Sequence, residues 1–106
     1  MTNDIQYWVK KFVEGIINQS DAIWQKHDAE LGNKYATQVT EAFQSLRSMG
    51  NIGRESLLPM LLHERNDVRV TVATYLLRFR TELALAVLRE ESRGKGWISL
   101  EAGEAI

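Results

Sequence analysis

The chain has 106 residues, of which 44% are apolar and 25% are charged, and its formal net charge is −1 at pH 7. These values are typical of a single globular domain with one core, and they argue against disorder. The lack of cysteine excludes a disulfide scaffold and a cysteine-based zinc site. No apolar run approaches the roughly 20 residues of a transmembrane helix. Residues 1–12 lack the pattern of a secretory signal, so we expect a cytoplasmic protein with no membrane partner.

The first half of the chain predicts helices, because its apolar residues recur at helical spacing. A stripe over 5–17 predicts a first helix, and a separate, weaker helix is expected over 20–31. Gly32-Asn33 is expected to end that second helix. A third helix is expected over 34–49, and the glycine-rich residues 50–53 are expected to stop it.

The second half predicts three shorter helices, over 54–63, 66–79 and 81–93, and Ser99 can open a last turn. No stretch alternates at period two for long, so no sheet is expected. The predicted class is all-α, with five to six helices in antiparallel pairs. We expect one core that contains Leu61, Val72, Leu76 and Leu83.

A faint internal repeat links the two halves. Five apolar residues of the third helix recur at a constant offset of 33 in the helix over 66–79. The paired positions are Tyr35 and Val68, Val39 and Val72, Ala42 and Tyr75, Phe43 and Leu76, and Leu46 and Phe79.

The residues around this repeat resemble a known family. A leucine-rich segment is followed by a polar turn, an Asp-x-Arg entry and an Ala-Leu seam: Leu57 to Leu62, His63 to Asn66, Asp67-Val68-Arg69, Val72-Ala73 and Leu76-Leu77. This pattern resembles a HEAT-like repeat of the armadillo-type superfamily, and within it small bacterial single-domain proteins. The resemblance implies a short α–α superhelix forming one domain over 1–106. Residues 1–31 are less repeat-like, 34–93 are the clearest repeat region, and 97–106 form a truncated or capping helix.

The resemblance also implies roles for particular residues. Asp67 is expected to satisfy amides at the start of its helix, and Arg69 to tie one repeat unit to its neighbour. The second helices of such repeats line a concave side, which predicts a polar partner-binding stripe. Its six candidates are Gln38, Glu41, Ser45, Thr71, Thr74 and Arg78.

Nothing in the sequence points to catalysis or a cofactor. It has no P-loop, no G-x-G-x-x-G, no G-x-S-x-G and no cysteine nucleophile. His27, Asp28 and Glu30 are the most tempting metal ligands, but adjacent helical residues diverge by about 100°. They are interpreted as a polar surface, and no metal, cofactor or catalytic residue is expected.

The expected function is therefore protein–protein interaction, which includes an immunity-type role against a toxin or effector. The alternative is a nucleic-acid-binding HEAT-like protein, because residues 47–95 carry eight arginines and one lysine against six acids. The arginines concerned are Arg47, Arg54, Arg65, Arg69, Arg78, Arg80, Arg89 and Arg93. At the C-terminal edge, either residues 97–106, anchored by Trp97, cap the helices or a second copy forms a homodimer.

Overall fold

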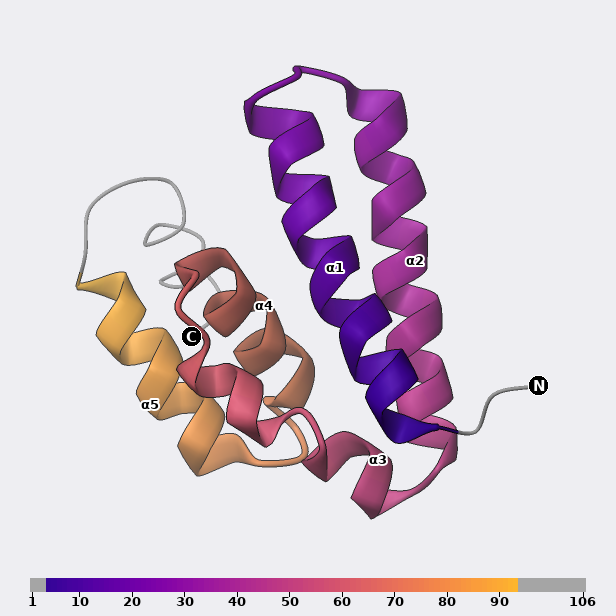
Figure 1. The fold of residues 1–106 in the computed structure, drawn as a ribbon. Helices are drawn as coiled ribbons and strands as arrows, with labels where there is room; N and C mark the ends of the chain where they lie inside the picture. Colours follow the sequence, from indigo (N-terminus) through magenta and orange to yellow (C-terminus); the bar gives the residue numbers. More distant parts are fainter. Residues whose placement is uncertain (1–3, 94–106) are drawn as a thin grey trace. The chain divides into compact units, whose positions relative to one another are not determined.

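The structure, a computed structural model, describes residues 4–93. Within that range the chain forms five α-helices and one 3₁₀ helix and no strand, which confirms the predicted all-α class. The elements are α1 (Ile5–Trp24), α2 (Ala29–Ser48), α3 (Asn51–Glu55), η1 (Leu58–Leu62), α4 (Asn66–Leu76) and α5 (Thr81–Ser92) (Figure 1). The chain divides into two compact units, Met1–Leu57 and Leu58–Ile106. The predicted capping segment over 97–106, with its anchor Trp97, lies outside the described residues.

In the first unit, α1 and α2 form a long antiparallel hairpin (Figure 1). Each helix begins at an aspartate whose side chain caps it: Asp4 Oδ1 accepts from the Gln6 amide and Asp28 Oδ1 from the Leu31 amide, both at 2.9 Å. Such caps satisfy amides that have no partner within the helix. The buried apolar residues are Val9, Phe12, Ile16 and Ala22 of α1, with Val39, Ala42 and Leu46 of α2.

Two glycines bring the helices of the hairpin close together. A Cβ at Gly15 would lie 2.7 Å from Val39 Cγ2, and a Cβ at Gly32 would lie 2.8 Å from Ile23 Cγ1. Neither distance leaves room for a methyl group, so the close packing of α1 on α2 depends on the missing side chains. Gly15 belongs to α1, whereas Gly32 belongs to α2.

The predicted boundaries in this unit are partly wrong. There is no separate helix over 20–31, because α1 continues to Trp24 and the turn follows at 25–28. Gly32-Asn33 does not end a helix, because Gly32 lies inside α2 and is needed for its contact with α1. The expected stop at 50–53 holds for α2, which ends at Ser48 before Gly50, at φ +80°.

The helix predicted over 54–63 is replaced by two short elements. Asn51–Glu55 forms α3 and Leu58–Leu62 forms η1, which contains Pro59. A proline has no amide hydrogen to donate and therefore interrupts an α-helix except near its start. The chain around Pro59 therefore forms a tighter 3₁₀ turn in place of an α-helix.

In the second unit, α4 packs against both η1 and α5. Its apolar core consists of Leu61 from η1, Val68, Val70, Val72, Ala73 and Leu76 from α4, and Ala84 and Leu88 from α5. Three of the four predicted core residues, Leu61, Val72 and Leu76, are therefore buried as expected.

The fourth, Leu83, is a wrong prediction, because its exposed fraction is 51%. α5 turns Ala84 and Leu88, four residues apart, into the core, and Leu83 lies about 100° around the helix from Ala84. The helix predicted over 66–79 is also shorter than expected: α4 ends at Leu76, and the amides of Leu77 and Phe79 bond to carbonyls three residues back.

Candidate functional site

The six residues of the predicted polar stripe divide between the two units. Gln38, Glu41 and Ser45 lie on α2, at spacings of three and four residues that place them on one helical face. In the second unit, Thr71 and Thr74 lie on α4, and Arg78 follows its end. Each unit thus presents three of the six predicted residues.

A partner-binding stripe requires exposed side chains, and only three of the six meet this requirement. Glu41, Thr74 and Arg78 are exposed, whereas Gln38, Ser45 and Thr71 are half-buried. The Gln38 side-chain amide donates to the Lys11 carbonyl at 3.0 Å, so this residue helps to hold α2 on α1. Sequence periodicity predicted on which face of the helix each side chain lies, but not which side chains a neighbouring helix contacts.

Two of the three hydroxyl groups on the stripe bond to their own helices. The Thr74 hydroxyl donates to the Val70 carbonyl at 2.9 Å, and the Ser45 hydroxyl donates to the Glu41 carbonyl at 3.0 Å. The exposed members of the stripe are Glu41 in the first unit and Thr74 and Arg78 in the second.

Asp67 is a buried charged residue at the start of α4. Its Oδ1 accepts from the Val68 amide at 2.8 Å, and its carboxylate receives two bonds from the Arg65 guanidinium, at 3.0 and 2.7 Å. Burial of a carboxylate is costly unless it is paired and hydrogen-bonded, and both conditions are met here. This geometry agrees with a structural role at the helix start.

Arg69 connects three segments of the second unit. Its Nε and Nη2 donate to the two carboxylate oxygens of Glu91 on α5, at 3.2 and 3.1 Å. Its Nη1 donates to the carbonyls of His63 and Glu64 in the turn before α4, at 2.7 and 3.1 Å. We call these residues the Arg69 network. The planar guanidinium suits this task because it presents several donors in a fixed geometry.

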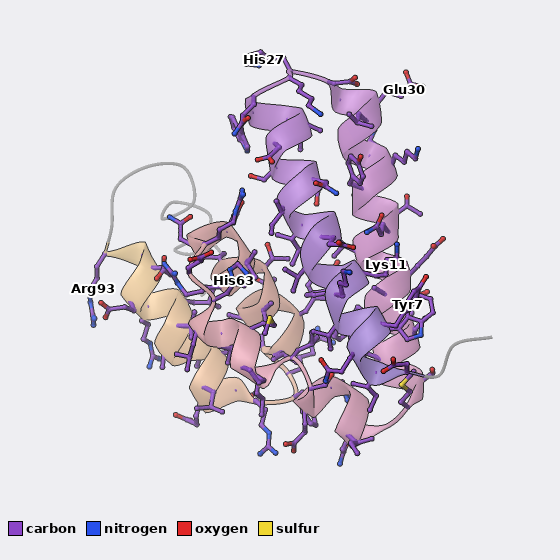
Figure 2. All side chains as sticks on the ribbon, in the orientation of Figure 1. Tyr7, Lys11, His27, Glu30, His63 and Arg93 are labelled. Atoms are coloured by element: carbon purple, nitrogen blue, oxygen red, sulfur yellow. The ribbon has the colours of Figure 1, made fainter. Side chains whose placement is uncertain are left out.

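His63, labelled in Figure 2, has a structural partner in the same turn. Its Nδ1 accepts from the Arg65 backbone amide at 3.0 Å. The imidazole therefore acts as an acceptor that shapes the turn between η1 and α4.

His27 and Glu30 lie at the turn of the α1–α2 hairpin (Figure 2). His27 adopts a left-handed conformation at φ 53°, and the Asp28 carboxylate caps α2. No group of three or more His, Asp or Glu residues between positions 4 and 93 is arranged to hold a metal ion. The role of Asp28 as a helix cap was missed, although an aspartate one residue before a helical segment is its usual signal.

Several of the eight arginines are engaged within the chain. Arg65, Arg69 and Arg93 form ion pairs with Asp67, Glu91 and Glu90. The Arg54 guanidinium donates to Asn51 Oδ1 at 2.8 Å, and that of Arg80 lies 5.2 Å from the centre of the Phe79 ring. The three ion pairs reduce the positive charge available for a phosphate backbone.

Large apolar side chains are exposed in both units, and sequence reasoning missed most of them. The exposed fraction is 86% for Leu62 and 68% for Ile52. The full set is Tyr7, Ile23, Trp24, Ile52, Leu62 and Leu83. Tyr7 lies beside Lys11 near the start of α1, and the Lys11 ammonium is 5.6 Å from its ring centre (Figure 2). Tyr7 lies within 5–17 but is not one of the residues of the apolar stripe. That position off the apolar face was the available signal of its exposure.

Among the helices between residues 4 and 93, none is long and apolar enough to cross a membrane. No family model matches the chain, and no curated protein matches it.

The all-α fold has a solved counterpart. The chain is similar to the crystal structure of the protein RPA1889 from Rhodopseudomonas palustris CGA009, with a TM-score of 0.88 and 20% sequence identity. The match covers 95% of this chain and 84% of that one. At this identity the likeness shows the shared fold alone.

Proposed function

We propose that the chain is a small protein–protein interaction module with a HEAT-like helical repeat. Support for the repeat comes from the five residue pairs at an offset of 33. Every pair has at least one buried member, and no member of any pair is exposed. The paired positions therefore face inward in both units.

The single observation that carries the interaction function is the exposure of large apolar side chains in both units, with Leu62 and Ile52 the most exposed. Scattered exposed leucines are common, but tyrosine and tryptophan are enriched where proteins meet. Tyr7 and Trp24 are both on the surface of α1. A protein partner gains from covering such side chains, whereas a phosphate backbone does not.

The polar stripe provides the specificity in this proposal. Its exposed members, Glu41, Thr74 and Arg78, carry one negative charge, one positive charge and a neutral hydroxyl. Neither unit presents a cluster of like charges at these positions, which suits a modest protein partner. A nucleic-acid surface would need several unpaired cations at these positions.

Thr74 gives the sharpest test, because the chain offers a matched control. Thr40 is also exposed on a helix and donates its hydroxyl to the carbonyl four residues back, at 3.1 Å, as Thr74 does at 2.9 Å. Thr40 lies on α2 away from the face of Gln38, Glu41 and Ser45. The Thr74→Arg and Thr40→Arg variants therefore add the same bulk and charge at sites that differ mainly in their relation to the stripe.

The experiment captures proteins from a lysate of the source cells on the immobilised chain at about 150 mM salt, close to physiological ionic strength. We expect a protein that is retained by the wild type and by Thr40→Arg but is lost on Thr74→Arg. The proposal is wrong if no retained protein responds to Thr74→Arg. Duplex DNA binding with a log–log salt slope steeper than about −4, unaffected by Thr74→Arg, would instead make the arginines the site.

A further inference from the structure

The outer face of α5 combines an apolar centre with a distinctive charge pattern. Ala84 and Leu88 are buried, while the side chains on the opposite face are exposed. We define the outer face of α5 by Glu82, Leu83, Ala86, Arg89, Glu90 and Arg93, all of which are exposed. Leu83 is half accessible and Ala86 is small, so another helix could approach closely at this point.

The charges on this face fall into two sets. Arg93 forms an ion pair with Glu90 at 2.7 Å, within the same helical surface. Glu82 and Arg89 have no ion pair within residues 4–93. They lie seven residues apart, two helical turns, and flank Leu83 and Ala86 along the same side of the helix.

The charge pattern on the outer face of α5 is complementary to the same pattern on a second, antiparallel copy of the helix. If two α5 helices run antiparallel with a two-fold axis near Ala86, Glu82 of each copy lies opposite Arg89 of the other. In the same register Leu83 of each copy lies over Ala86 of the other. Charged residues that flank an apolar seam in this way are the usual determinants of partner choice and orientation in paired helices.

We propose that the outer face of α5 binds a second copy of this chain through an antiparallel α5–α5 contact. The contact contains two equivalent ion pairs between Glu82 and Arg89 and a centre formed by Leu83 and Ala86. Because the arrangement is isologous, the same patch serves on both copies and the assembly closes at two. This surface shares no residue with the polar stripe and only Leu83 with the exposed apolar set, so the inference goes beyond the proposed function.

The expected dimer is weak. α5 has 12 residues and a length of about 18 Å. Stable protein interfaces bury about 1,200–2,000 Å² in total, and one short helix pair lies at the low end of that range or below it. Association should therefore depend on protein concentration, and added salt should weaken it, because the ion pairs are near solvent.

The first test measures the average mass of the full chain by sedimentation equilibrium between about 20 μM and 1 mM, a range suited to weak association. We expect the wild type to shift toward twice the monomer mass. Glu82→Arg and Arg89→Glu should each raise the Kd about tenfold, because each turns two attractive contacts into repulsive ones. The double variant, Glu82→Arg with Arg89→Glu, should restore association.

The double variant also separates a lost contact from a lost fold. Each single change opposes the helix dipole, since it places a cation near the start of α5 or an anion near its end. The double variant carries both penalties. If it associates while the single variants do not, damage to α5 cannot explain their loss.

A second test uses the absence of cysteine from the chain. Ala86→Cys places one thiol beside the proposed two-fold axis, where two copies could meet the short distances that a disulfide requires. Mild oxidation should yield a covalent dimer, and Glu82→Arg in the same background should reduce its yield. Thr40→Cys, an exposed thiol on α2, serves as the control and should yield much less.

Three outcomes overturn the proposal. One is a chain that stays monomeric over the whole range from about 20 μM to 1 mM. Another is a dimer whose Kd is unchanged by Glu82→Arg and by Arg89→Glu, because it must then use another surface. The last is equal cross-linking of Ala86→Cys and Thr40→Cys.

Discussion

In Met1–Leu57 two helices of 20 residues each pack closely through glycines, whereas in Leu58–Ile106 helices of 11 and 12 residues are joined by the Arg69 network. The N-cap residues of the long helices are aspartates whose side chains accept backbone hydrogen bonds, whereas the N-cap residues of the short helices make no such bond. Isolated helices below about 12–15 residues are marginal in water, so α4 and α5 depend strongly on tertiary contacts.

The two units hold their helices in place by different contacts. In the first unit, apolar contact along two long helices is sufficient, and the polar tie from Gln38 to Lys11 is an addition. In the second unit, the guanidinium of Arg69 bonds the turn before α4 and the end of α5 at once. We therefore expect that truncation of a buried apolar side chain and loss of a polar contact both lower the stability of the second unit strongly.

The largest effect is expected from Leu76→Ala. Leu76 is fully buried in α4, and its truncation should destabilise the protein by about 2–5 kcal/mol through lost transfer energy and a cavity. That is a large share of the roughly 5–15 kcal/mol typical of a domain. Urea unfolding followed by far-ultraviolet circular dichroism measures the change.

Leu62→Ala is the matched control for Leu76→Ala, because it removes the same atoms from a side chain that is 86% exposed. Its effect should stay within about 0.5 kcal/mol. If Leu76→Ala is as stable as the wild type, the described core of the second unit is wrong.

The next effect concerns the Arg69 network. Arg69→Met should cost about 1–3 kcal/mol, because it leaves the Glu91 carboxylate and two backbone carbonyls without their donor. The side chains of Arg69 and Glu91 are only 25% and 16% exposed, so water cannot fully replace the lost bonds.

Arg93→Met provides the contrast to Arg69→Met. Arg93 and Glu90 are 72% and 71% exposed, and such surface pairs contribute about 0–1 kcal/mol. Denaturation midpoints of the two variants should therefore differ clearly. Equal midpoints would show that the second unit does not depend on the Arg69 network.

A smaller effect is expected for the glycine contact of the first unit. Gly15→Ala should cost about 1 kcal/mol, because overpacking outweighs the gain in helix propensity. The new methyl group would meet Val39 Cγ2 at 2.7 Å. In a Val39→Ala background that atom is gone, so Gly15→Ala should become neutral or stabilising there. A double-mutant cycle measured by thermal unfolding gives the coupling, and a coupling of zero would contradict the close approach.

The sequence predicted the helical class and most of the core, because burial follows the 3.6-residue period of each helix. Phe12, Ile16, Val39, Leu46, Val72 and Leu76 lie on predicted stripes and are buried. The period could not distinguish a glycine that ends a helix from one that permits a close contact. Gly32 was assigned to the first kind and belongs to the second. That distinction depends on Ile23, which is close in space but nine residues away in sequence.

The candidate site was less predictable for the same reason. Thr74 and Arg78 are exposed as expected, but Gln38 is half-buried because α1 supplies a carbonyl that its amide can reach. Leu83 was assigned to the core because it shares a stripe with Ala84 and Leu88. Ala84 and Leu88, four residues apart, are enough to pack against a single neighbouring helix, so Leu83 remained at the surface. Sequence spacing shows which residues share a helical face, but it does not show how much of that face a neighbouring helix covers.

The smallest effect on stability, and the largest on function, is expected from Thr74→Arg. Thr74 is exposed, and its hydroxyl bonds only to the Val70 carbonyl of its own helix, so the change should alter stability by less than about 0.5 kcal/mol. Thr40→Arg loses an equivalent bond to the Ala36 carbonyl and should have a similar melting temperature. Differential scanning calorimetry on both variants checks this equivalence before any binding measurement is made. With stability matched, a partner that is lost on Thr74→Arg and kept on Thr40→Arg must contact the surface around Thr74. If Thr74→Arg instead melts well below Thr40→Arg, Thr74 supports the fold of the second unit. The loss of a partner on Thr74→Arg would then not show that Thr74 contacts it.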